Sequence, residues 1–449
     1  MKLWDKGKPF DKVTQDFTTG KDRVLDLLLA RYDIIGSIAH VIMLESVKII
    51  SLDESKALKK ALLHIYKQIL SGEFVISEGV EDVHSEVEKQ LTSTLGEAGK
   101  KVHAGRSRND QVLLDIHLFI RDKINEIVLA IETFSGKLLS LSEKYSNYFL
   151  PGYTHFQAAM PASFGLWFGS FAETLADDLL VFYAAYRMVN QNPLGSAAGF
   201  GTSLPIDRQM TTSLLGFENM RFNSMHAMNA RGKSELISAQ ALASLAYTLG
   251  KYAGDVCLYM SGNFNFIDMP EEYSTGSSIM PHKRNPDIFE IVRARCSAIQ
   301  SLPNQISLLA NNLPSGYHRD FQVIKAYFLP AFEDILDCIR IVERIFPELI
   351  IKNIDRNDEK YKYIFSVENV NRLVAEGKPF REAYREVADA IRDGNYKPDE
   401  TAVYSHEGSI GNLCNDKIAV KIKDRIRMFE FEKASEAIRV LLYSDIPLF

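Results

Sequence analysis

The apolar residues of this chain recur at the spacing of unusually long helices. One stripe advances in steps of three or four residues, through Ile116, Ile120, Ile124, Ile127, Ile131, Phe134, Leu138 and Leu141. Because such steps keep side chains on one helix face, the stripe predicts a single helix of about 35 residues, nearly three times the mean length. Asp110 is a suitable first residue for it, and Pro151-Gly152 is a clear stop.

A second stripe and three further segments predict more helices. The second stripe has Pro161 near the first turn of its helix and runs through Phe164, Phe168, Phe171, Leu175, Leu179, Phe182 and Tyr186. The other helices are expected at about 234–260, 287–312 and 322–346. Long helices joined by polar loops, without strand alternation, indicate an all-α bundle. The chain is too long for one ordinary core, so we expect an N-terminal helical domain (1–105), a central bundle (106–355) and a C-terminal helical domain (356–449).

Composition excludes several classes of protein. The formal net charge of −6 argues against a general binder of nucleic acid or anionic membranes. The four cysteines lie far apart and form no CxxC pair, which is typical of free thiols in a reducing compartment. The N-terminus lacks the apolar core of a signal peptide, and no apolar run approaches the ~18 residues of a membrane helix. We therefore expect a cytoplasmic protein without nucleic-acid or membrane partners.

Two polar segments before expected helices could bind an anion. In 274–286, Gly276 and neighbouring serines make a hydrogen-bonding loop, while Lys283 and Arg284 place two cations before a helix N-terminus. A basic surface loop explains this segment equally well. In 106–111, two arginines could grip a carboxylate, although a helix cap by Asn109 or Asp110 with solvated arginines is the simpler interpretation.

A third segment places Thr154-His155 between two bundle helices. A histidine there could act as an acid or base near neutral pH, although a hydrogen-bonded structural histidine is the more common role. None of the ten histidines has the spacing of a zinc-protease motif, so no metal site is predicted.

These segments together resemble the motifs of one enzyme family. GSSIMPHKRNP resembles the GSSxxPxKxNP signature of the fumarase/aspartase superfamily, whose members eliminate fumarate from succinyl compounds. HAGRSRNDQV and GYTHFQ are similar to argininosuccinate lyase and its animal-lens relative δ-crystallin, rather than to fumarase or adenylosuccinate lyase. EDVHSEVE at 81–88 and LVAEGKPFREAY at 373–384 extend the resemblance, in order and spacing, over most of the chain.

The resemblance implies an activity and roles for particular residues. The reaction would be the reversible β-elimination of argininosuccinate to arginine and fumarate, in arginine biosynthesis, without cofactor or metal. Ser277 would take the Cβ proton, His155 paired with Glu290 would be linked to protonation of the leaving nitrogen, and Lys283 would stabilise the developing charge. The remaining substrate contacts implied by the motifs are Ser107, Arg108, Asn109, Thr154, Asn285, Tyr317, Gln322 and Lys325.

Topology adds an expectation about assembly. One bundle of antiparallel helices cannot gather all these loops at one end, so GYTHFQ and GSSIMPHKRNP would need partners from other copies. The resemblance implies a homotetramer in which four subunits pack their long helices together and each active site takes loops from three of them. The aromatic stripe at 164–186 suits such burial, and a core within one chain explains the stripe equally well.

Some positions depart from the family pattern. Asp22 stands where many members have a substrate-contacting serine, His282 replaces a glutamine, and MNARGKSE at 228–235 differs from SDRDxxxE. These changes concern specificity more than the reaction. The alternatives are another lyase of the superfamily and a catalytically silent structural protein of the δ-crystallin kind. The presence of Ser277, His155, Lys283 and Glu290 favours activity.

Overall fold

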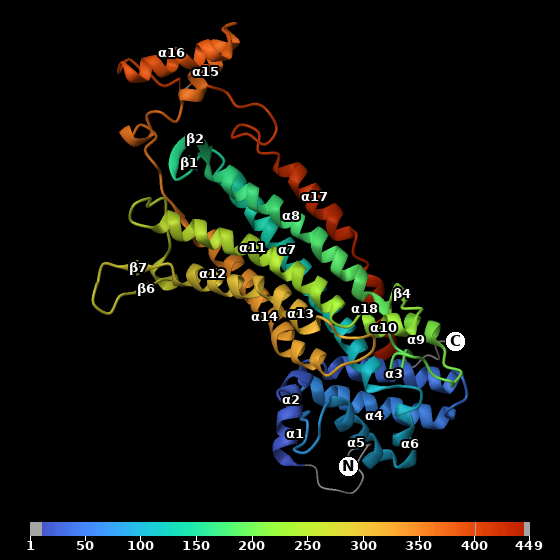
Figure 1. The fold of residues 1–449 in the computed structure, drawn as a ribbon. Helices are drawn as coiled ribbons and strands as arrows, with labels where there is room; N and C mark the ends of the chain where they lie inside the picture. The colour runs from blue at the N-terminus through green and yellow to red at the C-terminus, as the bar shows by residue number, and fades with distance from the viewer. Residues whose placement is uncertain (1–10, 400, 444–449) are drawn as a thin grey trace.

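The long helices lie side by side in the middle of the molecule, in a computed structural model that describes residues 11–399 and 401–443 (Figure 1). The first of them leads away from the N-terminal region, and the second returns toward it. Their bounds are α7 (Arg108–Lys144), α8 (Phe164–Val189), α11 (Lys233–Met260), α12 (Asp287–Gln300), α13 (Leu302–Ala310) and α14 (Asp320–Ile345). The prediction of an all-α bundle is confirmed.

Two details of the bundle differ from the sequence prediction. The helix expected at 287–312 is broken at Ser301, because Pro303 lies in the first turn of α13 and cannot donate a backbone hydrogen bond to the preceding turn. Pro161 does not lie in the first turn of α8. It belongs to strand β2, where it lies opposite Pro151 of β1 in a two-stranded hairpin. Proline has no backbone N–H to donate, and an edge strand tolerates this loss.

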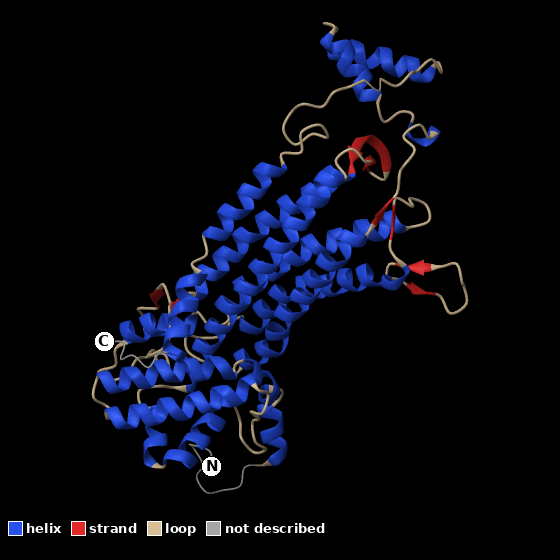
Figure 2. Cartoon of the chain, turned by 180° about the vertical axis from the view of Figure 1, so that it is seen from behind, coloured by secondary structure: helices blue, strands red, loops and turns tan. Residues whose placement is uncertain are grey.

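Short strands join some of the helices (Figure 2). They form four two-stranded sheets, β1–β2, β5–β8 and β6–β7 antiparallel and β3–β4 parallel. The bounds are β1 (Phe149–Thr154), β2 (Gln157–Ser163), β3 (Gln191–Asn192), β4 (Asn219–Met220), β5 (Ile267–Asp268), β6 (Thr275–Gly276), β7 (Arg284–Asn285) and β8 (Ile350–Ile351). Shorter helices between them are α9 (Arg208–Leu214), α10 (Ser224–Asn229), η3 (Glu271–Tyr273), η4 (Phe346–Glu348) and η5 (Glu359–Tyr361).

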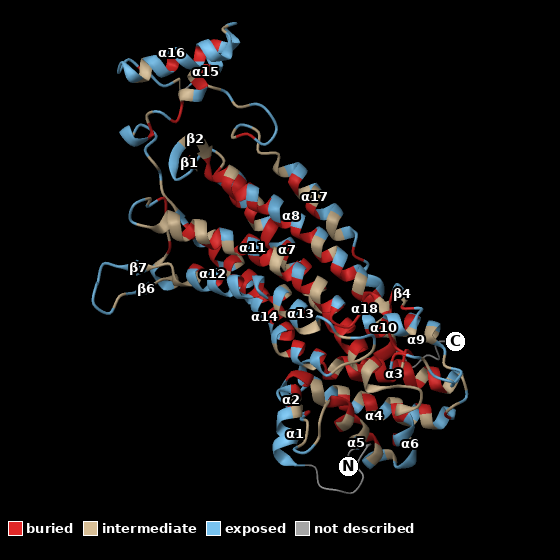
Figure 3. Ribbon diagram, in the orientation of Figure 1, coloured by how far each residue is buried: buried red, intermediate tan, exposed pale blue. Residues whose placement is uncertain are grey.

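Both apolar stripes are buried inside the chain itself (Figure 3). The stripe of α7 and the aromatic stripe of α8 belong to one hydrophobic cluster, in which Phe168 packs against Trp167 with ring centroids 4.8 Å apart. Burial of this much apolar area is the main force that holds the bundle together. The aromatic stripe is therefore an intrachain core, and it gives no support to packing between subunits.

The N-terminal region covers one end of the bundle and shares its hydrophobic cluster. Its elements are α1 (Lys12–Thr19), α2 (Asp22–Leu25), η1 (Asp26–Leu28), α3 (Ala30–Ser46), α4 (Leu52–Leu70), α5 (Val83–Leu95), α6 (Glu97–Lys100) and η2 (Lys101–His103). Among the described residues no single helix has the length and apolarity to cross a membrane. The segments 22–28 and 30–46 meet those criteria only when joined, across a 65° bend.

The C-terminal segment divides between the two ends of the bundle. Helices α15 (Ser366–Ala375) and α16 (Phe380–Arg392) pack on each other around a small core of their own, beyond the β1–β2 hairpin. Helix α17 (Asn415–Arg427) then runs back along α8, and α18 (Phe431–Tyr443) reaches α3. The domain boundaries at 105/106 and 355/356 stay a prediction.

Candidate active site

The start of α7 is fixed by a capping box. The Ser107 hydroxyl accepts a hydrogen bond from the Asn109 backbone at 3.3 Å, and the Ser107 backbone donates to Asp110 Oδ1 at 2.9 Å. The second Asp110 oxygen accepts from the backbone of Gly195 and Ala197. Ser107 is thus the cap, not Asn109 or Asp110 as the simpler interpretation had it. The cap holds the first turn of α7 against the 193–201 loop.

One pocket, of about 140 Å³, collects five of the eight remaining substrate contacts that the family motifs imply. Arg108 and Asn109 come from the first turn of α7, Tyr317 from the loop before α14, and Gln322 and Lys325 from α14 itself. The other lining residues are Asp22, Asp26, Glu81, Asp82, His84, Val112, Arg231 and Arg319. Segments about 200 residues apart in the sequence therefore converge at the end of the bundle that meets the N-terminal region.

Charges of both signs line this pocket. Lys325 Nζ lies 2.9 Å from Asp22 Oδ1 and 2.7 Å from Asp26 Oδ1. Arg108 Nη1 lies 3.3 Å from carboxylate oxygens of Glu81 and of Asp82. Such a lining suits a zwitterion, whose ammonium and carboxylate need opposite partners.

Sequence reasoning missed several of these pocket residues. Asp26, Glu81, Asp82 and Arg319 were given no role, although Glu81 and Asp82 open the EDVHSEVE segment and Arg319 lies in YHRD. Arg319 forms an ion pair with Glu81. Both segments resemble family motifs, but a motif does not show which of its residues form ion pairs.

A buried cluster adjoins the pocket through His84, which is one of the lining residues. His84 Nδ1 is 2.8 Å from Asp33 Oδ1 and 3.9 Å from Asp115 Oδ2. Burial lowers the pKa of His84, but the two carboxylates outweigh burial and raise the pKa to about 9. Burial and the charge of Asp33 raise the pKa of Asp115 well above its ordinary value. The spacing of the three ligand atoms, within 4.8 Å, would admit a metal ion, which the sequence did not predict, but the proton on His84 already balances Asp33.

Replacing His84 by alanine is expected to lower the free energy of unfolding by about 3–5 kcal/mol, because it leaves Asp33 buried without its cation. The contribution of His84 is complete below its unfolded pKa of 6.5 and is lost as the pH rises through about 9, because the folded pKa is the higher one. Urea titrations between neutral pH and pH ~10 measure both effects. The control His64→Ala, on an exposed face of α4, should stay within about 1 kcal/mol. An equally small change for His84→Ala would contradict the charged cluster.

Thr154 and His155 lie at the tip of the β1–β2 hairpin. The two-residue turn is His155-Phe156, and both residues have positive φ, 52° and 59°. Non-glycine residues rarely adopt this region, so the turn holds strain of the kind found at functional sites. Both Thr154 and His155 are exposed. In this chain His155 has no acidic residue beside it in the turn.

Ser277 lies in the loop that joins β6 to β7. Its Oγ accepts hydrogen bonds from the backbone N–H groups of Met280 at 3.1 Å and Ile279 at 3.4 Å. Lys283 is exposed near the end of the same loop, and Asn285 follows in β7. Glu290 is exposed in the first turn of α12.

The positive character of this loop is smaller than the sequence suggested. Arg284 turns back to Glu271 at 3.2 Å, so it does not act together with Lys283. The first turn of α12 also carries Asp287, which accepts a hydrogen bond from the Thr275 backbone at 3.2 Å. Of the two cations that the sequence placed before α12, Lys283 is therefore the one left to meet an anion.

The structure does not bring the pocket, the β1–β2 hairpin and the β6–β7 loop together within one chain. The β1–β2 hairpin and the β6–β7 loop lie away from the pocket, whose residues come from α2, α7 and α14 next to the N-terminal region (Figures 1 and 2). The β6–β7 loop and the start of α12 carry Ser277, Lys283, Asn285 and Glu290. The β1–β2 hairpin carries Thr154 and His155.

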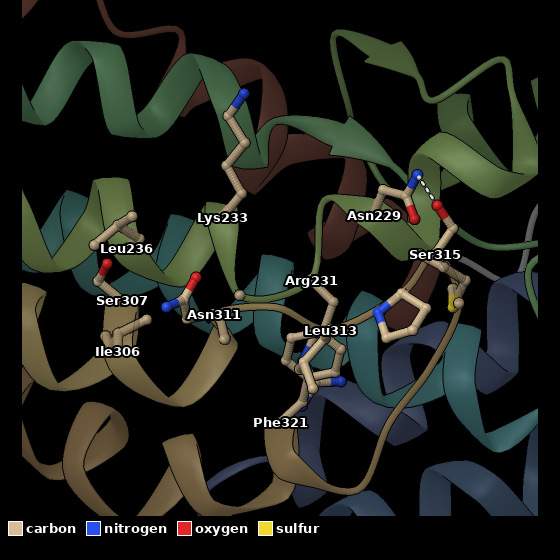
Figure 4. Close-up of a pocket in the computed structure, with 15 residues that line it drawn as sticks. Asn229, Arg231, Lys233, Leu236, Ile306, Ser307, Asn311, Leu313, Ser315 and Phe321 are labelled. Atoms are coloured by element: carbon tan, nitrogen blue, oxygen red, sulfur yellow. Dashed lines mark hydrogen bonds between the residues drawn. The ribbon is translucent and has the colours of Figure 1, made fainter.

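A second cavity, of about 370 Å³, adjoins the pocket (Figure 4). It lies between the MNARGKSE segment, the end of α13 and the loop before α14, and Arg231 lines both spaces. Arg231 Nε donates to Glu235 Oε1 at 2.8 Å, and this pair stabilises the start of α11. Gly232 precedes α11 with φ of 79°, and a side chain there would meet the Phe321 ring. The departure from the family pattern thus sits beside the pocket.

Solved structures share this fold over nearly the whole chain. An EDDS lyase in complex with formate has a TM-score of 0.73 at 21% identity, covering 97% of this chain and 94% of its own. A recombinant class II fumarase from Schistosoma mansoni has a TM-score of 0.70 at 18% identity, covering 95% and 94%. At these identities the likeness concerns the fold, which is that of helical-bundle lyases. A family model described as "Lyase" also matches residues 7–301, which makes the chain a member of that class.

The sequence comparison defines the family more narrowly. The argininosuccinate lyase of Bacteroides fragilis strain ATCC 25285 is 52% identical over 442 residues, 98% of this chain and 99% of that relative. This chain belongs to the argininosuccinate lyase family. The resemblance seen in its motifs is confirmed.

Proposed function

We propose that this protein is a cytoplasmic argininosuccinate lyase, which splits argininosuccinate into arginine and fumarate by β-elimination in arginine biosynthesis. The observation that carries the proposal is the 52% identity to an argininosuccinate lyase over 98% of this chain, which has Ser277, His155, Lys283 and Glu290 at the motif positions. The net charge of −6 supports a small-molecule enzyme without nucleic-acid or membrane partners.

The Ser277 loop has the groups that removal of an aliphatic proton needs. The proton next to the succinyl carboxylate is weakly acidic, and an ordinary serine hydroxyl is a poor base. The N–H groups of Ile279 and Met280 already point at Ser277 Oγ, and together with Lys283 they favour its alkoxide form. One preorganised donor of this kind is worth about 3–4 kcal/mol where charge develops. We propose that these residues carry the reaction without a cofactor.

Departure of the guanidino nitrogen needs a proton, which is the role we assign to His155 with Glu290. The two residues lie on different segments, β1–β2 and α12, and the hairpin turn holds His155 exposed at its tip. An exposed histidine is available to a neighbouring chain. Thr154 would contact the substrate from the same turn.

Assembly into a homotetramer would complete the site. A pocket of about 140 Å³ is well below the ~300 Å³ at which small-molecule sites begin, so it holds only part of the substrate. Large apolar side chains are also exposed along the bundle, where a partner would cover them. They include Tyr247, Ile291, Leu308 and Tyr327. We propose that each active site combines this pocket with a β1–β2 hairpin and a β6–β7 loop from two other subunits.

Initial rates with a panel of substrates test the proposal. Argininosuccinate should release fumarate with a kcat/KM far above those for adenylosuccinate, aspartate and malate, measured by ultraviolet absorbance. A higher kcat/KM for one of the other three would assign the protein to a different lyase. Absence of turnover with all four would favour a structural protein of the δ-crystallin kind.

The pairing of His155 with Glu290 predicts non-additive losses. Glu290→Gln should lower kcat and shift the limb of the pH–rate profile that reports the histidine. The variant with both Glu290→Gln and His155→Ala should be little worse than His155→Ala alone, because the two act as one unit. Losses that multiply in full would show independent roles. The control Glu132→Gln lies on α7, outside the pocket, the β1–β2 hairpin and the β6–β7 loop. It should behave as wild type.

A further inference from the structure

Asp22 brings a negative charge into the pocket that the neighbouring residues do not balance. Asp22 is the first residue of α2, and its side chain is buried beside Lys325. Asp26, one turn later, lies beside the same Lys325 nitrogen. Two carboxylates thus share one ammonium, which leaves a formal charge of −1 on the three groups.

The neighbouring cations cannot supply the missing positive charge. Arg108 and Arg319 are both engaged by Glu81, and Arg108 also by Asp82. His84 is engaged by Asp33, and Arg231 is engaged by Glu235. The pKa of Asp22 is raised to about 6, with burial as the largest cause, as expected for a carboxylate that its cation only partly compensates.

Of the two carboxylates beside Lys325, Asp22 is the one that a ligand can reach. Its side chain is 13% exposed, against 3% for Asp26. Asp26 also accepts a hydrogen bond from the Val83 backbone through Oδ2. Asp22 Oδ1 forms the ion pair with Lys325. Within residues 11–399 and 401–443, Asp22 Oδ2 forms no ion pair.

We propose that Asp22 binds the α-ammonium of the arginine portion of the substrate, and so makes a free α-amino group a condition for tight binding. This rests on the proposed function. Argininosuccinate has two cationic parts. The guanidino nitrogen is at the scissile bond and must lie beside Ser277 and His155, so the α-ammonium is the part left for a remote negative pocket. Asn109, Tyr317 and Gln322 surround the same space and supply uncharged donors for the adjoining α-carboxylate.

Three small probes separate the ammonium from the rest of arginine. Arginine has both α groups, agmatine lacks the carboxylate, and δ-guanidinovalerate lacks the amino group and is smaller, so that its failure to bind cannot be steric. Dissociation constants are measured by calorimetry on the full-length protein, and inhibition constants in the fumarate-releasing reaction. Wild type should bind arginine about 100-fold more tightly than δ-guanidinovalerate, the usual effect of leaving a buried charge unpaired.

The variant Asp22→Asn keeps the shape of the side chain and removes its charge. It should weaken arginine and agmatine by about 30- to 100-fold and leave δ-guanidinovalerate unchanged or improved, so that the preference for the ammonium disappears. For argininosuccinate, KM should rise by a similar factor with little change in kcat, since this contact is remote from the reacting bond. The control Asp16→Asn, exposed on α1 outside the pocket, should retain the full preference.

The possible outcomes are distinct. Equal weakening of all three probes by Asp22→Asn would show that Asp22 only holds Lys325 in place, and would overturn the proposal. Equal binding of arginine and δ-guanidinovalerate by wild type would overturn it without any variant. If the protein releases no fumarate but calorimetry shows the ammonium preference and its loss in Asp22→Asn, the proposed function fails and the Asp22 site stands.

Discussion

The variant Ser277→Ala is expected to lose about 100- to 10,000-fold in kcat while it keeps most of its affinity for argininosuccinate. The loss is that of a positioned proton-transfer group. Affinity is kept because the pocket with Arg108, Asn109 and Lys325 lies in a different part of the chain from the β6–β7 loop. Steady-state kinetics with argininosuccinate measure the two effects separately, as kcat and KM.

A matched substitution shows whether the loss belongs to Ser277 itself. Ser297→Ala removes an exposed hydroxyl from α12, where Oγ donates to the Arg293 carbonyl within the helix, and should leave kcat unchanged. If Ser277→Ala keeps more than about a tenth of wild-type kcat, a loss far below that of a general base, Ser277 is not the base. The hydrogen bonds from Ile279 and Met280 would then serve only to shape the loop.

Mixing two inactive variants is expected to restore activity. His155→Ala and Lys283→Met should each be nearly inactive, since each removes a group from every site. If these residues reach a site from different chains, random tetramers of an equal mixture should recover about a quarter of wild-type activity, because each intact site needs two independently drawn good segments. Co-expression or joint refolding, followed by the fumarate assay, measures the recovery.

The control mixture uses two defects in one segment. Ser277→Ala and Lys283→Met lie in the same β6–β7 loop, so every loop in their mixture carries a defect and no activity should return. Failure of His155→Ala and Lys283→Met to rescue each other, despite proven subunit exchange, would remove the shared-site proposal. The family membership would stand, because it rests on the sequence.

The helices were the most predictable part of the structure. The stripe of α7 repeats over so many turns that only a helix explains it, and the capping residues lie within a few positions of its predicted start. The break at Ser301 was missed because the apolar period continues through Leu302 and Ile306 into α13. The two-residue strands were missed because such short pairs depend on contacts between segments and leave no alternation to detect.

The candidate site was predictable only where a motif names a residue type. The motifs name Arg108, Asn109 and Lys325, which converge in the pocket. The sequence could not show, however, that Lys325 is shared by Asp22 and Asp26. These partners lie about 300 residues from Lys325, and ion pairs at that separation depend on the tertiary fold alone. For the same reason the aromatic stripe of α8 fitted an intersubunit and an intrachain core equally well until its packing was known.

The most direct test of the central claim is the stoichiometry of the reaction. Purified protein is incubated with argininosuccinate, arginine is quantified by chromatography, and fumarate by its ultraviolet absorbance. Cleavage by β-elimination predicts that arginine and fumarate appear in equal amounts from the first time point, and that arginine with fumarate re-forms argininosuccinate in the reverse direction. Argininosuccinate that persists unchanged with fully folded protein, or fumarate that appears without arginine, would contradict the assignment.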